Sequence, residues 1–389
     1  MSLMSSKKST FTKKDCVALA TALTAGLALL GAHAQSTPAQ APTTPKLAEE
    51  QFKNIKVLKG IPAEQVIPAM QFMTASLGVE CEYCHVRQGK EMAFDKDDKK
   101  PKVAARKMIQ MMFAINKDNF EGKREVTCFS CHRGAADPVG TPIVATEDAA
   151  PESAADNKGG AAPALPTADQ LFDRYLAASG GAEAVQKVNS RIEKGMLAAS
   201  GGQHFPVDVY GKAPDKRISV MHLTGGDSVT GFDGHSGWLS VPGRPPHIMN
   251  ADEIFGARMD ADIHFVVDVK SLYRKWVVAP GEKIGSRETT QVVGRTEGQP
   301  PLKLYFDSQS GLLLRLIRYS ETPLGRLPTQ IDYSDYREAD GVKVPYRWSL
   351  ARPGNRFSIQ VDELHQNVPV DDAKFTPPPP PPDQKPAGH

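Results

Sequence analysis

Two short cysteine–histidine motifs are the residues of this sequence best suited to chemistry. Cys81-Glu-Tyr-Cys84-His85 and Cys128-Phe-Ser-Cys131-His132 share the spacing C-x-x-C-H. In this spacing two thiols can add to the vinyl groups of one haem, and the adjacent histidine can bind the iron. The sequence therefore predicts two covalently bound haem c groups. Their attachment points would be Cys81, Cys84, Cys128 and Cys131, with His85 and His132 as the proximal iron ligands.

Two other interpretations of these cysteines stay open. Pairs with the spacing C-x-x-C also bind zinc, and each pair could instead close a local disulfide. Neither interpretation explains why a histidine follows both pairs directly. The fifth cysteine of the sequence, Cys16, lies near the N-terminus and outside both motifs.

Each motif follows a segment with the apolar periodicity of a helix. One helix is expected over residues 62–77, ended by Gly78, and a second is expected to begin at Pro101. Both helices carry methionines at helical spacing, which we expect on one face. A methionine sulfur is a suitable sixth ligand for haem iron, although methionine is also an ordinary core residue. The only histidines of residues 46–137 are those of the two motifs, so bis-histidine ligation would need a ligand from elsewhere.

Residues 51–137 resemble one half of the four-haem cytochrome c subunit of photosynthetic reaction centres. The stretches that match are the two haem motifs, Met70-Gln-Phe-Met73-Thr-Ala, Arg106-Lys-Met108-Ile-Gln-Met111 and Ile115-Asn116. The resemblance implies that Met70 and Met108 are the distal iron ligands. Met73, Met111 and Met112 are alternatives, Met73 because the loop before Cys81 is slightly shorter than in the family.

The sequence also departs from that family. It has two haem motifs where the family has four, and it lacks the histidine that follows the second methionine helix there. Nothing after Pro138 resembles the family. The resemblance therefore supports the haem chemistry and the helix layout more than a photosynthetic role.

The N-terminus predicts export. Residues 1–34 combine four lysines, an apolar run over 17–30 and the small-residue site Ala32-His33-Ala34, as in a secretory signal peptide. An uncleaved membrane anchor is the alternative, because the apolar run is close to the minimum length for a span. We expect the protein in the periplasm or on the outer face of the envelope. The formal net charge of +2 argues against a nucleic-acid partner.

Composition divides the rest of the chain. We expect a flexible lead-in over 35–45, a di-haem cytochrome c domain over 46–137, and a second folded domain over 166–376. Residues 138–165 have almost no large apolar side chains, so we expect a disordered linker there. Residues 377–389 form a proline-rich tail.

The second domain has the pattern of an antiparallel sheet with helices. Two short helices are expected at 168–178 and 182–188, and a helical insert at 251–276. Alternating apolar runs, separated by Gly and Asp-Gly turns, predict the strands. These runs are 192–198, 206–210, 216–222, 227–232, 289–293, 302–306, 312–319, 330–336, 346–350 and 356–364.

This domain resembles the periplasmic carriers of the outer-membrane lipoprotein-sorting type. The resemblance rests on Phe232-Asp-Gly-His-Ser-Gly-Trp238, Tyr333-Ser-Asp-Tyr336 and Val368-Pro-Val-Asp-Asp372. It implies a curved half-barrel whose cavity takes an acyl chain or another apolar ligand; a solid core without a ligand is the alternative. The expected fold class is thus multidomain α + β, with a small α-helical di-haem domain followed by a curved antiparallel β-sheet domain with helices.

We expect an electron carrier that passes single electrons between membrane or soluble redox proteins. One alternative is a haem peroxidase-type enzyme, which needs an iron with an open or weakly held sixth site. The other is an envelope protein that binds an apolar ligand or lipid and carries a haem redox module. We assign no catalytic residue, because the sequence has no hydrolase elbow, phosphate loop, nucleotide fingerprint or H-E-x-x-H motif.

Overall fold

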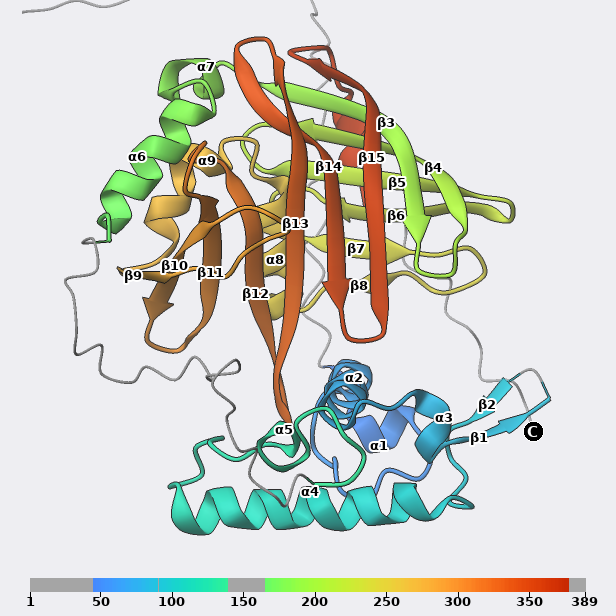
Figure 1. The fold of residues 1–389 in the computed structure, drawn as a ribbon. Helices are drawn as coiled ribbons and strands as arrows, with labels where there is room; N and C mark the ends of the chain where they lie inside the picture. Colours follow the sequence, from blue (N-terminus) through green and yellow to red (C-terminus); the bar gives the residue numbers. More distant parts are fainter. Residues whose placement is uncertain (1–44, 90, 139–164, 378–389) are drawn as a thin grey trace, which may run out of the picture. The chain divides into compact units, whose positions relative to one another are not determined.

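The computed structural model describes residues 45–89, 91–138 and 165–377 (Figure 1). The expected signal peptide, almost all of the lead-in and linker, and the proline-rich tail lie outside these residues. Among the described residues, no helix has both the length and the apolar character that a membrane span requires.

The part that carries the two motifs is built from helices and one small hairpin. Its elements are α1 (Ala48–Gln51), η1 (Ala63–Gln65), α2 (Val66–Leu77), α3 (Cys81–Cys84), β1 (Val86–Gln88), β2 (Glu91–Ala93), α4 (Lys100–Asn119) and α5 (Cys128–His132). The helix expected over 62–77 starts as a 3-10 turn at Ala63 and becomes α-helical at Val66. Gly78 ends it in the left-handed conformation, with φ of 63°, as predicted from its lack of a side chain. The β1–β2 hairpin was not predicted.

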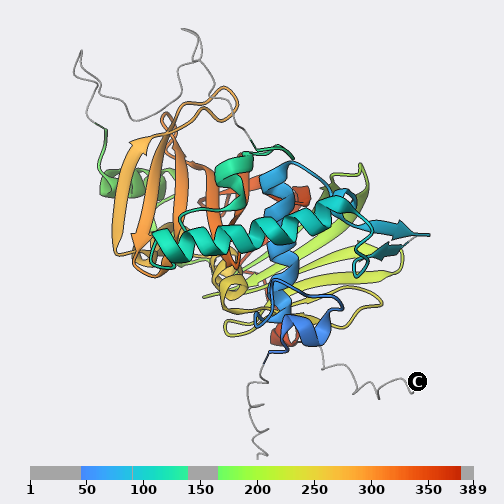
Figure 2. The same ribbon diagram turned by 90° about the horizontal axis from the view of Figure 1, so that it is seen from below.

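Helices α2 and α4 cross and pack against each other, as Figure 2 shows. The helix α4 buries Ile109, Met112 and Asn116, which follow one another at spacings of three and four residues. The methionines of α4 lie on one side of the helix, as their spacing predicts, but they differ in burial. Met112 faces the core, whereas Met108 and Met111 are exposed. Met108 lies one turn from Met112 on the same side of the helix, so the difference in burial comes from the residues that pack beside Met112.

The core of this part also contains two leucines from the second part of the chain. Leu324 and Leu327, beside the turn between β12 and β13, lie in one apolar cluster with Phe72, Ile109 and Met112. Arg124 lies at the same place and forms an ion pair with Glu321. The burial of Met112 therefore depends partly on residues far away in the sequence.

The second part is one open antiparallel sheet with short helices, which confirms the predicted fold class (Figure 1). Along the sheet the strands follow the order β8-β7-β6-β5-β4-β3-β15-β14-β13-β12-β11-β10-β9. Two meanders are therefore joined where the first long strand, β3, pairs with the last, β15. The strands are β3 (Ser190–Ala199), β4 (His204–Lys212), β5 (Lys216–Leu223), β6 (Gly226–Phe232), β7 (Gly237–Ser240), β8 (His247–Ile248), β9 (Lys275–Pro280), β10 (Thr289–Thr296), β11 (Gln299–Asp307), β12 (Leu313–Thr322), β13 (Gly325–Ala339), β14 (Val342–Arg352) and β15 (Asn355–Gln366).

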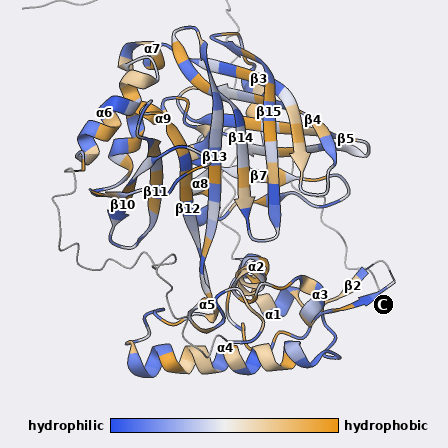
Figure 3. Cartoon of the chain, in the orientation of Figure 1, coloured by the Kyte–Doolittle hydropathy of each residue, from blue (hydrophilic) through white to orange (hydrophobic). Residues whose placement is uncertain are grey.

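Each apolar run that we predicted as a strand overlaps a strand of the sheet. Apolar and polar residues alternate along several of these strands, as expected when the two faces differ (Figure 3). The short strands β7, β8 and β9 were missed. The strand β9 lies where we expected the end of a helical insert, because its pairing with β10 is a tertiary contact that local sequence does not encode.

Short helices complete this part of the chain. They are α6 (Ala168–Ala178), α7 (Ala182–Gln186), α8 (Ala251–Ala261), α9 (Phe265–Asp268), η2 (Val269–Leu272) and η3 (Asp372–Phe375). The helices α6 and α9 contribute to a core with β10 to β13. On neighbouring strands, Gly231 is the partner of Trp238, whose side chain is buried. A Cβ atom on Gly231 would overlap the indole ring, so this close contact requires glycine.

Candidate functional sites

Each C-x-x-C pair occupies a single helical turn, α3 in the first motif and α5 in the second. Cysteines three residues apart therefore lie on one side of the turn. All four are free thiols, without a disulfide among the described residues. Burial raises the pKa of the Cys84 and Cys128 thiols. The part of the chain that the structure describes holds no group of three or more His, Cys, Asp or Glu side chains placed to bind a metal ion.

The imidazole of His85 is half-buried behind the first motif. Its ring meets Phe94 edge-on, with the ring centroids 5.1 Å apart. Burial, followed by the nearby charge of Lys102, lowers the pKa of His85, which favours the neutral form that binds metals. The Nδ1 atom of His85 is buried, and the backbone of Phe94 interacts with the ring as well. Phe94 therefore holds this imidazole through both its side chain and its backbone.

The imidazole of His132 is fixed by the backbone that follows it. Its Nδ1 donates a hydrogen bond to the carbonyl oxygen of Ala135 at 3.0 Å, which leaves Nε2 as the free ring nitrogen. The amide of Gly134 donates to the carbonyl of Ser76 at 2.9 Å. The second motif is therefore tied to the last turn of α2, and its histidine has the orientation typical of a metal ligand.

Asn116 positions the loop that leads into the second motif. This residue is 5% exposed, and its side-chain amide donates to the carbonyl of Val126 at 2.7 Å. Its Oδ1 atom accepts hydrogen bonds from the backbone amides of Glu125 and Val126, at 3.1 and 2.9 Å. We missed this role, although the signal was there: Asn116 is a polar residue in the buried row of α4.

A cluster of charges holds the loop beside the first motif. The carboxylate of Asp97 accepts hydrogen bonds from Arg106 at 2.8 Å and Lys56 at 3.0 Å, and forms an ion pair with Lys102 at 3.0 Å. These cations, Arg106 first, hold the pKa of Asp97 well below its usual range. Lys102 also donates to the carbonyl of Phe94 at 2.8 Å. The residue that packs on His85 is thereby connected to α4.

The methionines proposed as distal ligands differ in exposure. Met108 is 44% exposed and Met111 is 48% exposed, whereas Met112 is 4% exposed and packs in the core. Met70 and Met73 are half-buried and lie against the same core. The residues Met108 and Met111 are therefore exposed, whereas Met112 is buried.

Most of the exposed large apolar side chains of the described residues lie in the part with the motifs. In addition to Met108 and Met111 they include Ile67, Tyr83, Phe94, Val103, Phe113 and Phe129. Exposed apolar side chains in such number are typical of a surface that binds an apolar group. Together with the paired thiols and the two imidazoles, they form a set of residues that fits haem.

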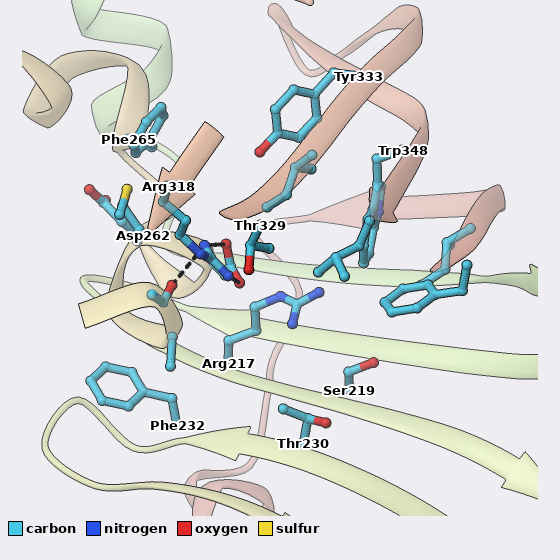
Figure 4. A pocket seen from close by; sticks show the side chains of 18 of the residues that line it. Arg217, Ser219, Thr230, Phe232, Asp262, Phe265, Arg318, Thr329, Tyr333 and Trp348 are labelled. Atoms are coloured by element: carbon cyan, nitrogen blue, oxygen red, sulfur yellow. Dashed lines mark hydrogen bonds and ion pairs between the residues drawn. The ribbon is translucent and has the colours of Figure 1, made fainter. Parts of the chain in front are cut away.

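A second candidate site is a cavity in the sheet of about 700 Å³ (Figure 4). It is lined by the strands β3 to β7 and β12 to β15, by His247 of β8, and by α8 and the segment that follows it. Part of its wall is apolar, with Trp348 and Phe357 packed edge-on at 5.9 Å between centroids. Its polar wall includes Arg318, which is held by the carboxylate of Asp260.

Comparison with known proteins finds similar proteins for both parts of the chain. Residues 23–191 match the profile of the family described as photosynthetic reaction centre cytochrome C subunit. The subunit of that name from Thermochromatium tepidum is 34% identical over 104 residues, which are 26% of this chain and 24% of the relative. Cytochrome c-554 of Chloroflexus aurantiacus is 34% identical over 89 residues, 21% of this chain and 20% of the relative. The resemblance predicted for the motif-bearing part is thereby confirmed. Our prediction that it ends at Pro138 was wrong, because the family profile continues to residue 191, at the start of β3. The aligned segments span only about a quarter of the curated relatives.

The sheet has solved structures of the expected type among its neighbours. A DUF1329 family protein from Desulfovibrio piger covers 54% of this chain and 96% of its own, with 13% identity and a TM-score of 0.39. A LolA superfamily protein from Nitrosomonas europaea covers 55% of this chain and 99% of its own, with 12% identity and a TM-score of 0.36. Scores this low carry no functional argument.

Proposed function

We propose that this protein is an exported di-haem c-type cytochrome that transfers single electrons between membrane or soluble redox proteins, and that it is a carrier and not an enzyme. The observation that supports this most is the repeated arrangement of a methionine-bearing helix followed by a single-turn C-x-x-C-H helix. This arrangement lies within the segment that matches the reaction-centre cytochrome family.

Each group in this arrangement has a defined task. The first haem would be held by the thiols of Cys81 and Cys84, with His85 as its proximal and Met70 as its distal ligand. The second haem would be held by Cys128 and Cys131, with His132 as its proximal and Met108 as its distal ligand. When bound, haem c supplies a one-electron iron couple whose potential is raised by methionine ligation. The protein's own side chains orient the ligands: Ala135 fixes the ring of His132, and Asn116 holds the loop before Cys128.

The number of haems is tested by composition. Acid–acetone extraction should leave the colour on the polypeptide, and the intact mass should exceed that of the apo chain by two haems. One haem or none would contradict the proposal. A reduced spectrum that carbon monoxide leaves unchanged would support a carrier, whereas a carbon monoxide complex would favour the peroxidase-type alternative, which needs an accessible sixth site.

The distal ligand of the second haem is tested by two matched substitutions on α4. Met108→Leu keeps the size of the side chain but removes the sulfur, so the near-infrared sulfur–iron band of one haem should vanish and its potential should fall. Met112→Leu makes the same chemical change at a buried position. It should leave band and potential unchanged and cost less than about 1.5 kcal/mol of stability. The opposite pattern would assign the ligand to Met112.

A second candidate function is favoured by the cavity in the sheet. Its volume of about 700 Å³ lies within the range of sites that bind small ligands, about 300–1,000 Å³. We propose that this part of the chain holds an apolar ligand or lipid. Solvent extraction of the purified protein followed by mass spectrometry tests this, and a protein that neither carries nor takes up an apolar molecule would contradict it.

A further inference from the structure

The cavity contains an arginine without an acidic partner. Every second residue of β5, namely Arg217, Ser219 and Met221, lines the cavity. Figure 4 shows the side chain of Arg217 directed into the cavity. Its guanidinium carbon lies 5.8 Å from the centroid of the Trp348 ring. No carboxylate of the described residues lies within ion-pair distance of it. A guanidinium that is partly withdrawn from water and unpaired is poised to bind an anion.

Two of the acidic groups of the cavity wall are paired with other cations. Asp260 pairs with Arg318 through both of its oxygens, one of them at 2.7 Å. Glu253 binds His247 at 2.8 Å. Arg217 has no such acidic partner among the described residues, and the same is true of Arg352, farther along the lining.

A second arginine lies close to Arg217 and is only loosely held. Arg191 and Arg217 both line a small recess that adjoins the main cavity. Arg191 lies 3.9 Å from Glu193, the outer limit of an ion pair, and its buried Nε has no hydrogen-bond partner among the described residues. The same recess is lined by Asp262, whose carboxylate accepts a hydrogen bond from the amide of His264 at 2.8 Å.

An apolar wall continues from the guanidinium of Arg217. Trp348 packs against Phe357, and apolar side chains of neighbouring strands extend this surface. They are Leu197, Phe205, Met221 and Ile359. A cation beside an apolar wall of the cavity fits a ligand that is charged at one end and apolar along the rest.

We propose that the cavity binds a linear amphipathic anion. Its alkyl chain lies along the wall formed by Trp348 and Phe357. Its carboxylate or phosphate group binds Arg217, and Arg191 is a further hydrogen-bond donor. This inference rests on the proposal that the cavity takes an apolar ligand, and it adds the chemistry of the head group. The planar fork of an arginine donates two parallel hydrogen bonds to either anion.

The head group is tested with probes that share one chain. Dodecanoate, dodecyl phosphate and dodecanol are titrated calorimetrically into the full-length haem-loaded protein, below their micelle concentrations. Both anions should bind at least about ten-fold more tightly than the alcohol, because a hydrogen bond to a charged group outweighs a neutral one. The tighter of the two anions identifies the head group as carboxylate or phosphate.

A matched pair of variants locates the anion. Arg217→Gln should weaken the binding of dodecanoate about ten-fold and leave dodecanol unchanged. Arg244→Gln, the same change at an exposed arginine that does not line the cavity, should alter neither.

The outcomes separate the two proposals. Equal binding of all three probes by the unmodified protein would overturn the head-group inference and leave the apolar-ligand proposal standing, and this comparison does not depend on a variant that folds. A preference for anions that survives Arg217→Gln would overturn the assignment to Arg217. No binding of any probe would contradict both proposals.

Discussion

The protonation of Asp262, a residue of the cavity wall that follows α8, should make the free energy of unfolding depend on pH. The Oδ1 atom of Asp262 accepts a hydrogen bond from the amide of His264 at 2.8 Å. Burial, followed by the charge of Asp268, raises the pKa of Asp262 from 3.8 to about 6. The folded protein therefore holds this proton more tightly than the unfolded chain does.

The sign and size of the effect follow from linkage. Between about pH 4 and pH 6 the carboxyl of Asp262 is protonated to a greater extent in the folded state than in the unfolded state. The contribution of Asp262 to the free energy of unfolding therefore falls as the pH rises through this window. A difference of about 2 in pKa corresponds to about 3 kcal/mol. Because the carboxyl is partly exposed, solvent screening reduces the expected loss at neutral pH to about 1–2 kcal/mol.

Asp262→Asn should recover this loss. Asparagine keeps the oxygen that accepts from His264 but cannot ionise, so the variant should be more stable by about 1–2 kcal/mol at pH 8 and equal to the unmodified protein near pH 4. Urea unfolding followed by far-ultraviolet circular dichroism at several pH values measures this. Asp260→Asn is the control: it removes the partner of Arg318 and should destabilise the protein at pH 8. A gain at Asp262 that is the same at pH 4 and pH 8, or no gain at pH 8, would refute the reasoning.

Three other substitutions or treatments test the structure. Asn116→Ala removes the hydrogen bonds that Asn116 makes to three backbone groups, of which only the Glu125 amide keeps another partner, the carbonyl of Lys123. It should cost about 1–3 kcal/mol by thermal unfolding and reduce haem attachment at the second motif, and no effect would count against a positioning role. Gly231→Ala should destabilise the protein by about 1–3 kcal/mol in urea unfolding, because the methyl group of the new alanine overlaps the buried indole of Trp238. Gly225→Ala is the control, since a Cβ atom there meets no atom within 4 Å, and equal effects of the two variants would contradict this reasoning. Limited proteolysis should cut first within residues 138–165, because this segment lacks the apolar residues needed to form a core. First cuts inside the sheet would contradict the proposed domain boundaries.

The sequence was sufficient for local features, because the signals for them are local. Glycine at position 78 predicted the end of α2, since only glycine adopts the left-handed conformation freely. Alternating apolar runs predicted the long strands of the sheet, because a half-buried strand must alternate. The spacing of Cys81, Cys84 and His85 carries the haem prediction by itself, and the same holds for the second motif. The ligand assignments remain predictions.

The tertiary structure decided which faces meet and which charges pair. Periodicity shows that α4 has an apolar face, but only packing against α2 and the β12–β13 turn separates the buried Met112 from the exposed Met108. The edge strand β9 exists because β10 offers it hydrogen bonds, which no window of sequence contains. Asp260 neutralises Arg318 while Arg217 stays unpaired, since Asp260 lies on α8 and reaches only one of the two arginines. Such pairings join residues far apart in the chain, so the distances that govern them are set by the fold and not by the order of the residues.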